Sequence, residues 1–229
     1  MFRWGLYSLR NLWARRVTTA LTVVGLGLVV FVLLAVLMLA HGLERTLGKT
    51  GDPENVIILR KGALSEIGSS LSREEIRAVA AQPDVRLTAD GRPLAVAEVG
   101  LQLTLRKGQG GSLTSVTLRG TAPEALAVRP AIRLIQGRLW KPGTTEIVVG
   151  ASIARQFPDA RVDRVLHFGN WAWTVVGVFE AGGSGFDSEV WGDAEQFLAT
   201  FHRATFSSMT LRLAHPATLP AFKDRIERD

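Results

Sequence analysis

Residues Val17 to Ala40 read VTTALTVVGLGLVVFVLLAVLMLA and determine how the rest of the chain is arranged. They lie within a run of 27 residues, Val17 to Leu43, that carries no formal charge. As a helix, the 24 residues from Val17 to Ala40 would be about 36 Å long, compared with a hydrocarbon core of about 30 Å. The stretch therefore predicts one transmembrane helix, with 186 of the 229 residues beyond it.

The charges on either side of this span indicate its orientation. The 16 preceding residues contain Arg3, Arg10, Arg15 and Arg16 and no acidic residue, whereas both signs follow Leu43. By the positive-inside rule, we expect the N-terminus in the cytoplasm and the large region outside it. A cleaved secretory signal would share the basic start, but its apolar core is shorter and ends at a small-residue cleavage site. We therefore interpret the span as an uncleaved anchor.

These observations divide the chain into three parts. We expect a cytoplasmic basic amphipathic segment (1–16), a transmembrane helix (17–43) and an extracytoplasmic domain (44–229). In the first part, apolar residues recur at helical spacing: Phe2, Leu6, Leu9 and Trp13. This spacing is typical of a short helix on the inner lipid surface, and a plain run-in to the span is the alternative.

Composition excludes several classes of protein. The chain has 27 Lys and Arg against 21 Asp and Glu, but four of the basic residues precede the span, which leaves 23 against 21 beyond it. This balance gives no phosphate-binding field, so we expect no nucleic-acid partner. Because there is no cysteine, disulfides, thiol catalysis and thiolate metal sites are excluded. The outer region is long enough to bury its own core, and its size also permits two subdomains.

Beyond the span, short apolar runs alternate with turn residues, which predicts mixed strands and helices. Asn55 to Arg60 (NVIILR) is typical of a buried strand. Ser72 and Glu75 form a capping box that predicts a helix of about ten residues, ending before Pro83. Further predicted elements are a helical turn capped by Thr121 and Glu124, a helix capped by Asp193, and a helix from about Thr218.

The middle of the chain is rich in predicted strands. Leu101 to Arg106 and Val116 to Arg119 are predicted to form a hairpin around a glycine-rich turn. A second hairpin is predicted around Gly169-Asn170, a pair that suits a two-residue primed turn. The other predicted strands are Ile132 to Ile135, Glu146 to Val149, Val165 to Phe168, Trp171 to Phe179 and Met209 to Leu213. Their irregular order favours an α+β fold over a doubly wound sheet.

Two glycine-rich segments resemble catalytic motifs only partly. Gly48-Lys49-Thr50 looks like the end of a phosphate-binding loop, but five residues separate Gly42 from Gly48 where the motif has four. We therefore expect a polar stretch leaving the membrane. Gly182-Gly-Ser-Gly185 is followed by Phe186, so the nucleophile motif G-x-S-x-G is not met at Ser184. We expect a structural turn there, with movement or a partner contact at Phe186 as the alternative.

The histidines, carboxylates and tryptophans also include side chains that could serve in catalysis or binding. The histidines are scattered, at positions 41, 167, 202 and 215, so neither a Ser-His enzyme nor a zinc site is indicated. Asp187 with Glu189, or Glu180, could form a carboxylate pair, but acids near glycine-rich turns are usually solvated. The tryptophans at 140, 171, 173 and 191 could stack on a sugar, although a core or interface role is the commoner one. We therefore assign no catalytic, cofactor-binding or metal residue.

Several segments together resemble a known family. They are LRNLWARRVTTALTVVGL at the start of the span, NVIILRKGA (Asn55 to Ala63), SSLSREEI (Ser69 to Ile76), GRLW (Gly137 to Trp140), EIVVG (Glu146 to Gly150), WTVVGVF (Trp173 to Phe179), GSGFDSEVWGD (Gly183 to Asp193), Arg203 and FSSMTLRL (Phe206 to Leu213). In order and spacing they resemble the first part of a MacB/FtsX-like ABC transporter permease, with its first span and its MacB-like periplasmic core domain.

The resemblance implies a non-catalytic permease subunit, or its N-terminal fragment, of an export-type or mechanotransmitting ABC transporter in the bacterial inner membrane. It implies a separate cytoplasmic ATPase, a homodimer or paired permease, contact with membrane lipid, a periplasmic adaptor as a further partner, and no cofactor. Full members of the family continue to three more spans, so a truncated, split or single-span relative is expected here. The alternatives are a membrane-anchored extracytoplasmic hydrolase and a single-span binding or sensor protein.

Overall fold

The computed structural model describes residues 16–50, 54–108 and 111–228. The chain divides into two compact units between Gly48 and Lys49. In the first unit, helix α2 runs from Arg16 to Thr50. Its part Arg16–Gly42 has a mean hydropathy of 3.1 and is the one helix of the described residues that is long and apolar enough to cross a membrane. The predicted segment 1–16 lies outside the described residues except for Arg16, so its structure stays a prediction.

The side chains of α2 suit a lipid environment. From Val17 to Leu39 the large apolar side chains are exposed, with Phe31 at 68% and Leu39 at 75%. A helix of this composition in water would expose far more apolar surface than monomeric soluble proteins do. The helical form of the predicted span is therefore confirmed, and its exposed surface fits a bilayer.

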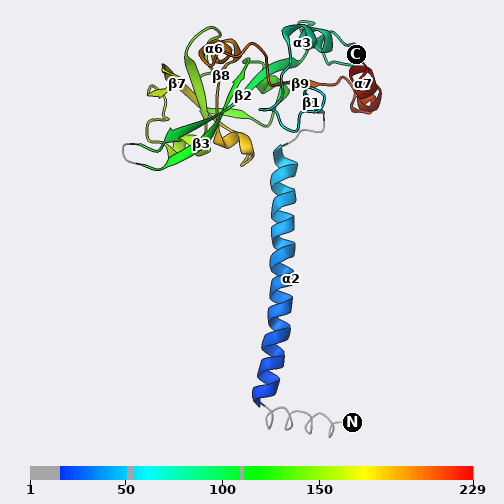
Figure 1. The fold of residues 1–229 in the computed structure, drawn as a ribbon, viewed down its shortest axis with the longest axis vertical. Helices are drawn as coiled ribbons and strands as arrows, with labels where there is room; N and C mark the ends of the chain where they lie inside the picture. The colour runs from blue at the N-terminus through cyan, green and yellow to red at the C-terminus, as the bar shows by residue number, and fades with distance from the viewer. Residues whose placement is uncertain (1–15, 51–53, 109–110, 229) are drawn as a thin grey trace. The chain divides into compact units, whose positions relative to one another are not determined.

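The second unit, here called the folded domain, is built on a nine-stranded sheet (Figure 1). The strand order is β1-β9-β2-β3-β8-β5-β7-β4, with β6 paired to β7. The β3–β8 and β5–β7 pairs are parallel, and the other pairs are antiparallel. The strands are β1 (Asn55–Ile58), β2 (Ala95–Arg106), β3 (Leu113–Thr121), β4 (Arg133–Gly137), β5 (Glu146–Gly150), β6 (Val165–Phe168), β7 (Trp171–Glu180), β8 (Glu189–Asp193) and β9 (Ser208–Arg212).

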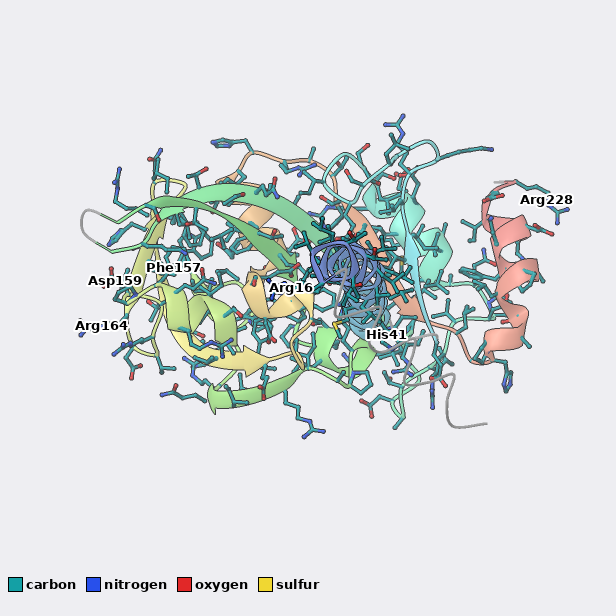
Figure 2. The ribbon with its side chains drawn as sticks, turned by 90° about the horizontal axis from the view of Figure 1, so that it is seen from below. Arg16, His41, Phe157, Asp159, Arg164 and Arg228 are labelled. Atoms are coloured by element: carbon teal, nitrogen blue, oxygen red, sulfur yellow. The ribbon has the colours of Figure 1, made fainter. Side chains whose placement is uncertain are left out.

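Short helices cover this sheet, so the α+β prediction is confirmed. They are α3 (Arg73–Ala80), α4 (Ala125–Val128), α5 (Ala151–Gln156), α6 (Ala194–Thr200) and α7 (Leu219–Ile226), with 3₁₀ turns η1 (Gly185–Ser188) and η2 (Pro216–Thr218). In Figure 2, Asp159 and Arg164, which lie between α5 and β6, are at one end of the folded domain, and Arg228, just after α7, is at the other.

Local sequence signals account for several of these elements. Ser72 and Glu75 form the predicted capping box at the start of α3, because the Ser72 N–H donates to Glu75 Oε2 at 2.6 Å and the Glu75 N–H donates to Ser72 Oγ at 3.2 Å. Gly169 and Asn170 have φ of +59° and +62°, as a primed hairpin turn requires. The Asp193 carboxylate caps α6, as predicted.

Two predictions need correction, and two further elements have no counterpart in the sequence analysis. Thr121 and Glu124 do not cap α4: Thr121 is held as the last residue of β3 opposite Asp193 of β8, and α4 starts without a side-chain cap. The strand Asn55 to Arg60 is shorter than predicted and only half buried, with Ile57 51% exposed, because β1 is an edge strand. Strand β8 and helix α5 were not predicted at all.

The sheet joins two halves through β2. The β9 half comprises β1, β9, α3 and α7, and packs around Met209, Leu211 and Phe222. The β3 half comprises the strands β3, β4, β5, β6, β7 and β8, with α5 and α6. It packs around Trp173 on one face of the sheet and around Trp191 on the other. Figure 1 shows the β9 half and the β3 half at opposite ends of the folded domain, with β2 running between them.

Candidate functional site

Strand β2 changes its neighbour in the middle. Ala95 to Glu98 pair with β9, whereas Val99 to Arg106 pair with β3. The last residue of the first stretch, Glu98, lies opposite Ser208 of β9. The connection between the two halves of the folded domain therefore passes through Glu98, and a carboxylate at such a position is unexpected in a sheet core.

The Glu98 side chain is fully buried and fully hydrogen-bonded. Arg129, which follows α4, donates to its two oxygens at 2.9 and 2.5 Å. Thr210 of β9 donates its hydroxyl at 2.8 Å, and Arg119 of β3 donates at 3.2 Å. One carboxylate therefore binds groups from both halves of the sheet.

Arg119 uses all five of its N–H donors. Its Nε and Nη2 donate to Glu189 of β8 at 2.8 and 3.0 Å. Its Nη1 donates to Glu98. Its Nη1 and Nη2 also donate to Glu66, from the loop between β1 and α3, at 3.3 and 3.1 Å. The Arg119 side chain is 6% exposed, and its guanidinium joins three carboxylates inside the domain.

Phe186 covers these charges. Its ring centroid lies 5.3 Å from the guanidinium carbon of Arg119 and 5.2 Å from that of Arg129. The ring also meets Trp191 edge to face at 5.8 Å, and the Trp191 Nε1–H donates to Glu189 at 2.7 Å. Both guanidiniums therefore have an aromatic face as well as carboxylate partners, which is favourable in a desolvated site.

The glycine-rich turn before Phe186 is held by one carboxylate. Asp187 accepts hydrogen bonds from the backbone N–H groups of Ala181 at 2.6 Å and Gly183 at 2.7 Å. Gly182 and Gly183 have φ of +63° and +80°, which favours glycine. The prediction of a structural turn at Gly182 to Gly185 is confirmed, and the turn carries Phe186 onto the ion pairs.

The electrostatics of the network keep Glu98 and Arg119 charged. Burial raises the pKa of Glu98, but the charges of Arg129 and Arg119 and the hydrogen bonds from Arg129 and Thr210 lower it below its usual value overall. Burial lowers the pKa of Arg119, yet Glu189 and Glu98 bring it well above its usual value. Neither group is set up to exchange a proton near neutral pH. The arrangement can fix the geometry of the two halves, and it has no free acid or base for catalysis.

The carboxylate pair considered as an alternative is not assembled, and, contrary to the expectation of solvated acids, Asp187 and Glu189 are buried. Asp187 bonds to the backbone of its own turn and Glu189 bonds to Arg119. Glu180 is exposed at the end of β7. Among the residues that the structure describes, no group of three or more His, Cys, Asp or Glu could hold a metal ion.

The other candidate residues from the sequence mostly have structural roles. Gly48-Lys49-Thr50 forms the last turn of α2, which is not a phosphate-binding loop. Trp140, Trp173 and Trp191 are buried in the core, whereas Trp171 is 51% exposed. The core interpretation of the tryptophans is therefore right for three of the four.

Glu98, Arg119, Arg129 and Glu66 were not identified from the sequence. A signal did exist for two of them, because Glu98 in AVAEVG and Arg119 in VTLRG are single charges inside apolar strands. Nothing local showed which partners they have, since Glu98 lies 21 residues from Arg119 and 31 from Arg129 in sequence.

An apolar helix long enough to cross a membrane, followed by a folded domain, is typical of a membrane-anchored protein. Residues 19–229 match the family described as MacB-like periplasmic core domain, and the chain belongs to this family. No curated protein matched the sequence. The family resemblance is thereby confirmed.

Two solved structures show the same fold. The periplasmic region of MacB from Actinobacillus actinomycetemcomitans is 13% identical with a TM-score of 0.57, over 80% of this chain and 86% of the other. The extracellular domain of the noncanonic ABC-type transporter YknZ from Gram-positive bacteria is 16% identical with a TM-score of 0.55, over 74% and 87%. The family and the apolar helix indicate a membrane-anchored permease component with an extracytoplasmic domain, a class that is generally not catalytic.

Proposed function

We propose that this chain is a non-catalytic permease subunit, or its N-terminal part, of an export-type or mechanotransmitting ABC transporter that works with a separate cytoplasmic ATPase. The observation that carries the proposal is the extent of the family match, which begins inside α2 and runs through the whole folded domain. A soluble binding domain would need no membrane helix before it.

The proposed orientation follows from charge. Four arginines and no acid precede the span, so the N-terminus lies in the cytoplasm, the span crosses the inner membrane and the folded domain lies outside. Strand β1 begins five residues after α2 ends, at Asn55 and Thr50 respectively, so movement of the span reaches the β9 half through a short linker.

In this proposal a second permease chain pairs with the span, because one helix encloses no pathway. ATP binding on the cytoplasmic side shifts the pair between two states, and the folded domains report that shift outside. A periplasmic adaptor is the further partner for the folded domain, and lipid surrounds the span.

Purification of the full chain from its native membrane, with subunits identified by mass spectrometry, tests this function. We expect an ABC ATPase to copurify and its ATP hydrolysis in lipid nanodiscs to depend on this chain. The matched control is the folded domain alone, residues 49–229, which should not capture the ATPase. Recovery of the full chain without any ATPase, after mild detergent and after crosslinking, would contradict the proposal.

A further inference from the structure

The buried network has one more carboxylate than it has guanidiniums. Glu66, Glu98 and Glu189 carry three negative charges, and Arg119 and Arg129 carry two positive ones. The exposed fraction of the side chain is 0% for Glu98, 10% for Glu189 and 27% for Glu66. Glu66 is thus the carboxylate closest to water. It lies in a loop, whereas Glu98 and Glu189 lie on strands.

Glu66 holds its loop, residues 60–70, onto the sheet. Its carboxylate accepts from both Nη atoms of Arg119 and from the Ser208 hydroxyl at 3.1 Å. The large apolar side chain at the tip, Leu64, is 102% exposed and adds no burial. Ile67 lies over Gly100 of β2, where an added Cβ would be 3.6 Å from the Ile67 side chain. The ion pair with Arg119, the Ser208 hydrogen bond and the Ile67 contact attach the outer part of the loop. Near the start of the loop, Lys61 Nζ also donates to the Glu227 carbonyl oxygen at 3.5 Å.

The neck of the loop is closed independently. The Arg60 N–H donates to Ser69 Oγ at 2.8 Å, and the Arg60 guanidinium donates to Ser70 Oγ at 3.1 Å. Ser69 is 1% exposed, so the closure sits within the domain. The outer part of the loop can therefore leave the sheet while its two ends stay in place.

The network tolerates loss of Glu66 better than loss of Glu98. Without it, two carboxylates face two guanidiniums, and Arg119 keeps its bonds to Glu189 and Glu98. Among the described residues, loss of Glu98 instead leaves Arg129 without a carboxylate partner in a buried site. An unpaired buried charge is strongly destabilising, whereas a carboxylate that moves into water is solvated.

We propose that the Glu66–Arg119 ion pair is a releasable latch between loop 60–70 and the β3 half. In the closed state the loop is bound as in this structure. In the open state Glu66 lies in water and Glu98, Arg119, Arg129 and Glu189 remain paired. The latch itself needs no transporter; its use in passing movement of the span to the β3 half rests on the proposed function, because loop 60–70 directly follows β1.

Hydrogen exchange of the full chain in lipid nanodiscs tests the latch. Glu66→Gln keeps the shape of the side chain and removes its charge, so we expect at least about tenfold faster exchange in residues 60–70, with β3 and β8 unchanged. Glu195→Gln is the matched control. Glu195 also binds an arginine through two contacts, both 2.6 Å to Arg73, but at the surface, and its loss should leave loop 60–70 unchanged.

Two results would overturn the latch. Unchanged exchange of loop 60–70 in Glu66→Gln would show that the ion pair does not hold the loop. Faster exchange of β3 and β8 together with the loop would show that the network opens as one unit. The nanodiscs contain no ATPase, so either of these two exchange results would contradict the latch without contradicting the proposed function. Conversely, failure to find an ATPase partner would contradict the proposed function without contradicting the latch.

Discussion

Arg119 donates to Glu98 at 3.2 Å at the place where β2 leaves β9 and joins β3. A slip of one residue in either pairing would turn Glu98 to the opposite face of the sheet and away from both guanidiniums. The ion pair therefore specifies the register of the two halves. The buried charges thus add to the hydrophobic pattern, which also disfavours a slip of one residue.

Glu98→Gln should destabilise the folded domain by about 3–5 kcal/mol, because Arg129 loses its only carboxylate partner among the described residues. Chemical denaturation followed by tryptophan fluorescence measures the change. Glu195→Gln, at the exposed pair with Arg73, should cost less than about 1 kcal/mol. Equal costs for the two variants would refute a special role of Glu98.

Gly150→Ala should disturb the turn that carries Phe186. A Cβ at Gly150 would lie 2.3 Å from the Asp187 carbonyl oxygen, so the turn must shift, at a cost of about 1–3 kcal/mol. Gly185→Ala is the control, since a Cβ there meets nothing within 4 Å. The melting temperatures of the two variants are compared, and a lower value for Gly185→Ala than for Gly150→Ala would contradict this role of Gly150.

The Arg138–Glu146 pair should make stability depend on pH. The hydrogen bond from Arg138 is the largest cause that lowers the pKa of Glu146, to about 2. Because the folded pKa lies below the unfolded value of about 4.3, the contribution is complete above that value and is lost as the pH falls towards 2.

The measurement is the difference in Tm between the natural chain and Glu146→Gln. It should be present at pH 6 and shrink between pH 5 and pH 2. Glu227→Gln, at a half-exposed pair with Lys223 at 3.7 Å, should change Tm little at any pH. A Glu146→Gln difference that stays constant with pH would contradict the assignment.

Engineered cysteines should report the topology without background, because the chain has none of its own. Ser115→Cys, at an exposed site on β3, should react in intact cells with a maleimide that does not cross the inner membrane. Ser8→Cys, before the span, should react only after lysis. The opposite labelling pattern would reverse the proposed orientation.

Signals that act over a few residues predicted much of the fold. The Ser72–Glu75 capping box and the Gly169-Asn170 turn were found because both parts of each signal lie within four residues. Strand β8 was missed because its EVWGD sequence, at Glu189 to Asp193, joins a glycine-rich turn and a helix cap and shows no alternation. It becomes a strand by pairing with β3 and β5.

Local sequence signals did not reveal the candidate site either, because its partners meet only through strand pairing. Glu66 and Glu189 meet Arg119 across 53 and 70 residues of sequence, and only the sheet topology brings them together. A charge inside an apolar strand does predict a buried partner. It does not say which residue the partner is.

Hydrogen exchange of the folded domain within the membrane complex shows whether nucleotide binding on the cytoplasmic side reaches loop 60–70. The full chain is reconstituted with its copurified ATPase in nanodiscs, and exchange is compared without nucleotide and with ATP and vanadate. We predict that nucleotide on the cytoplasmic side changes exchange in loop 60–70 outside, while β3 and β8 stay unchanged. Identical exchange in both states, while the ATPase hydrolyses ATP normally, would contradict it.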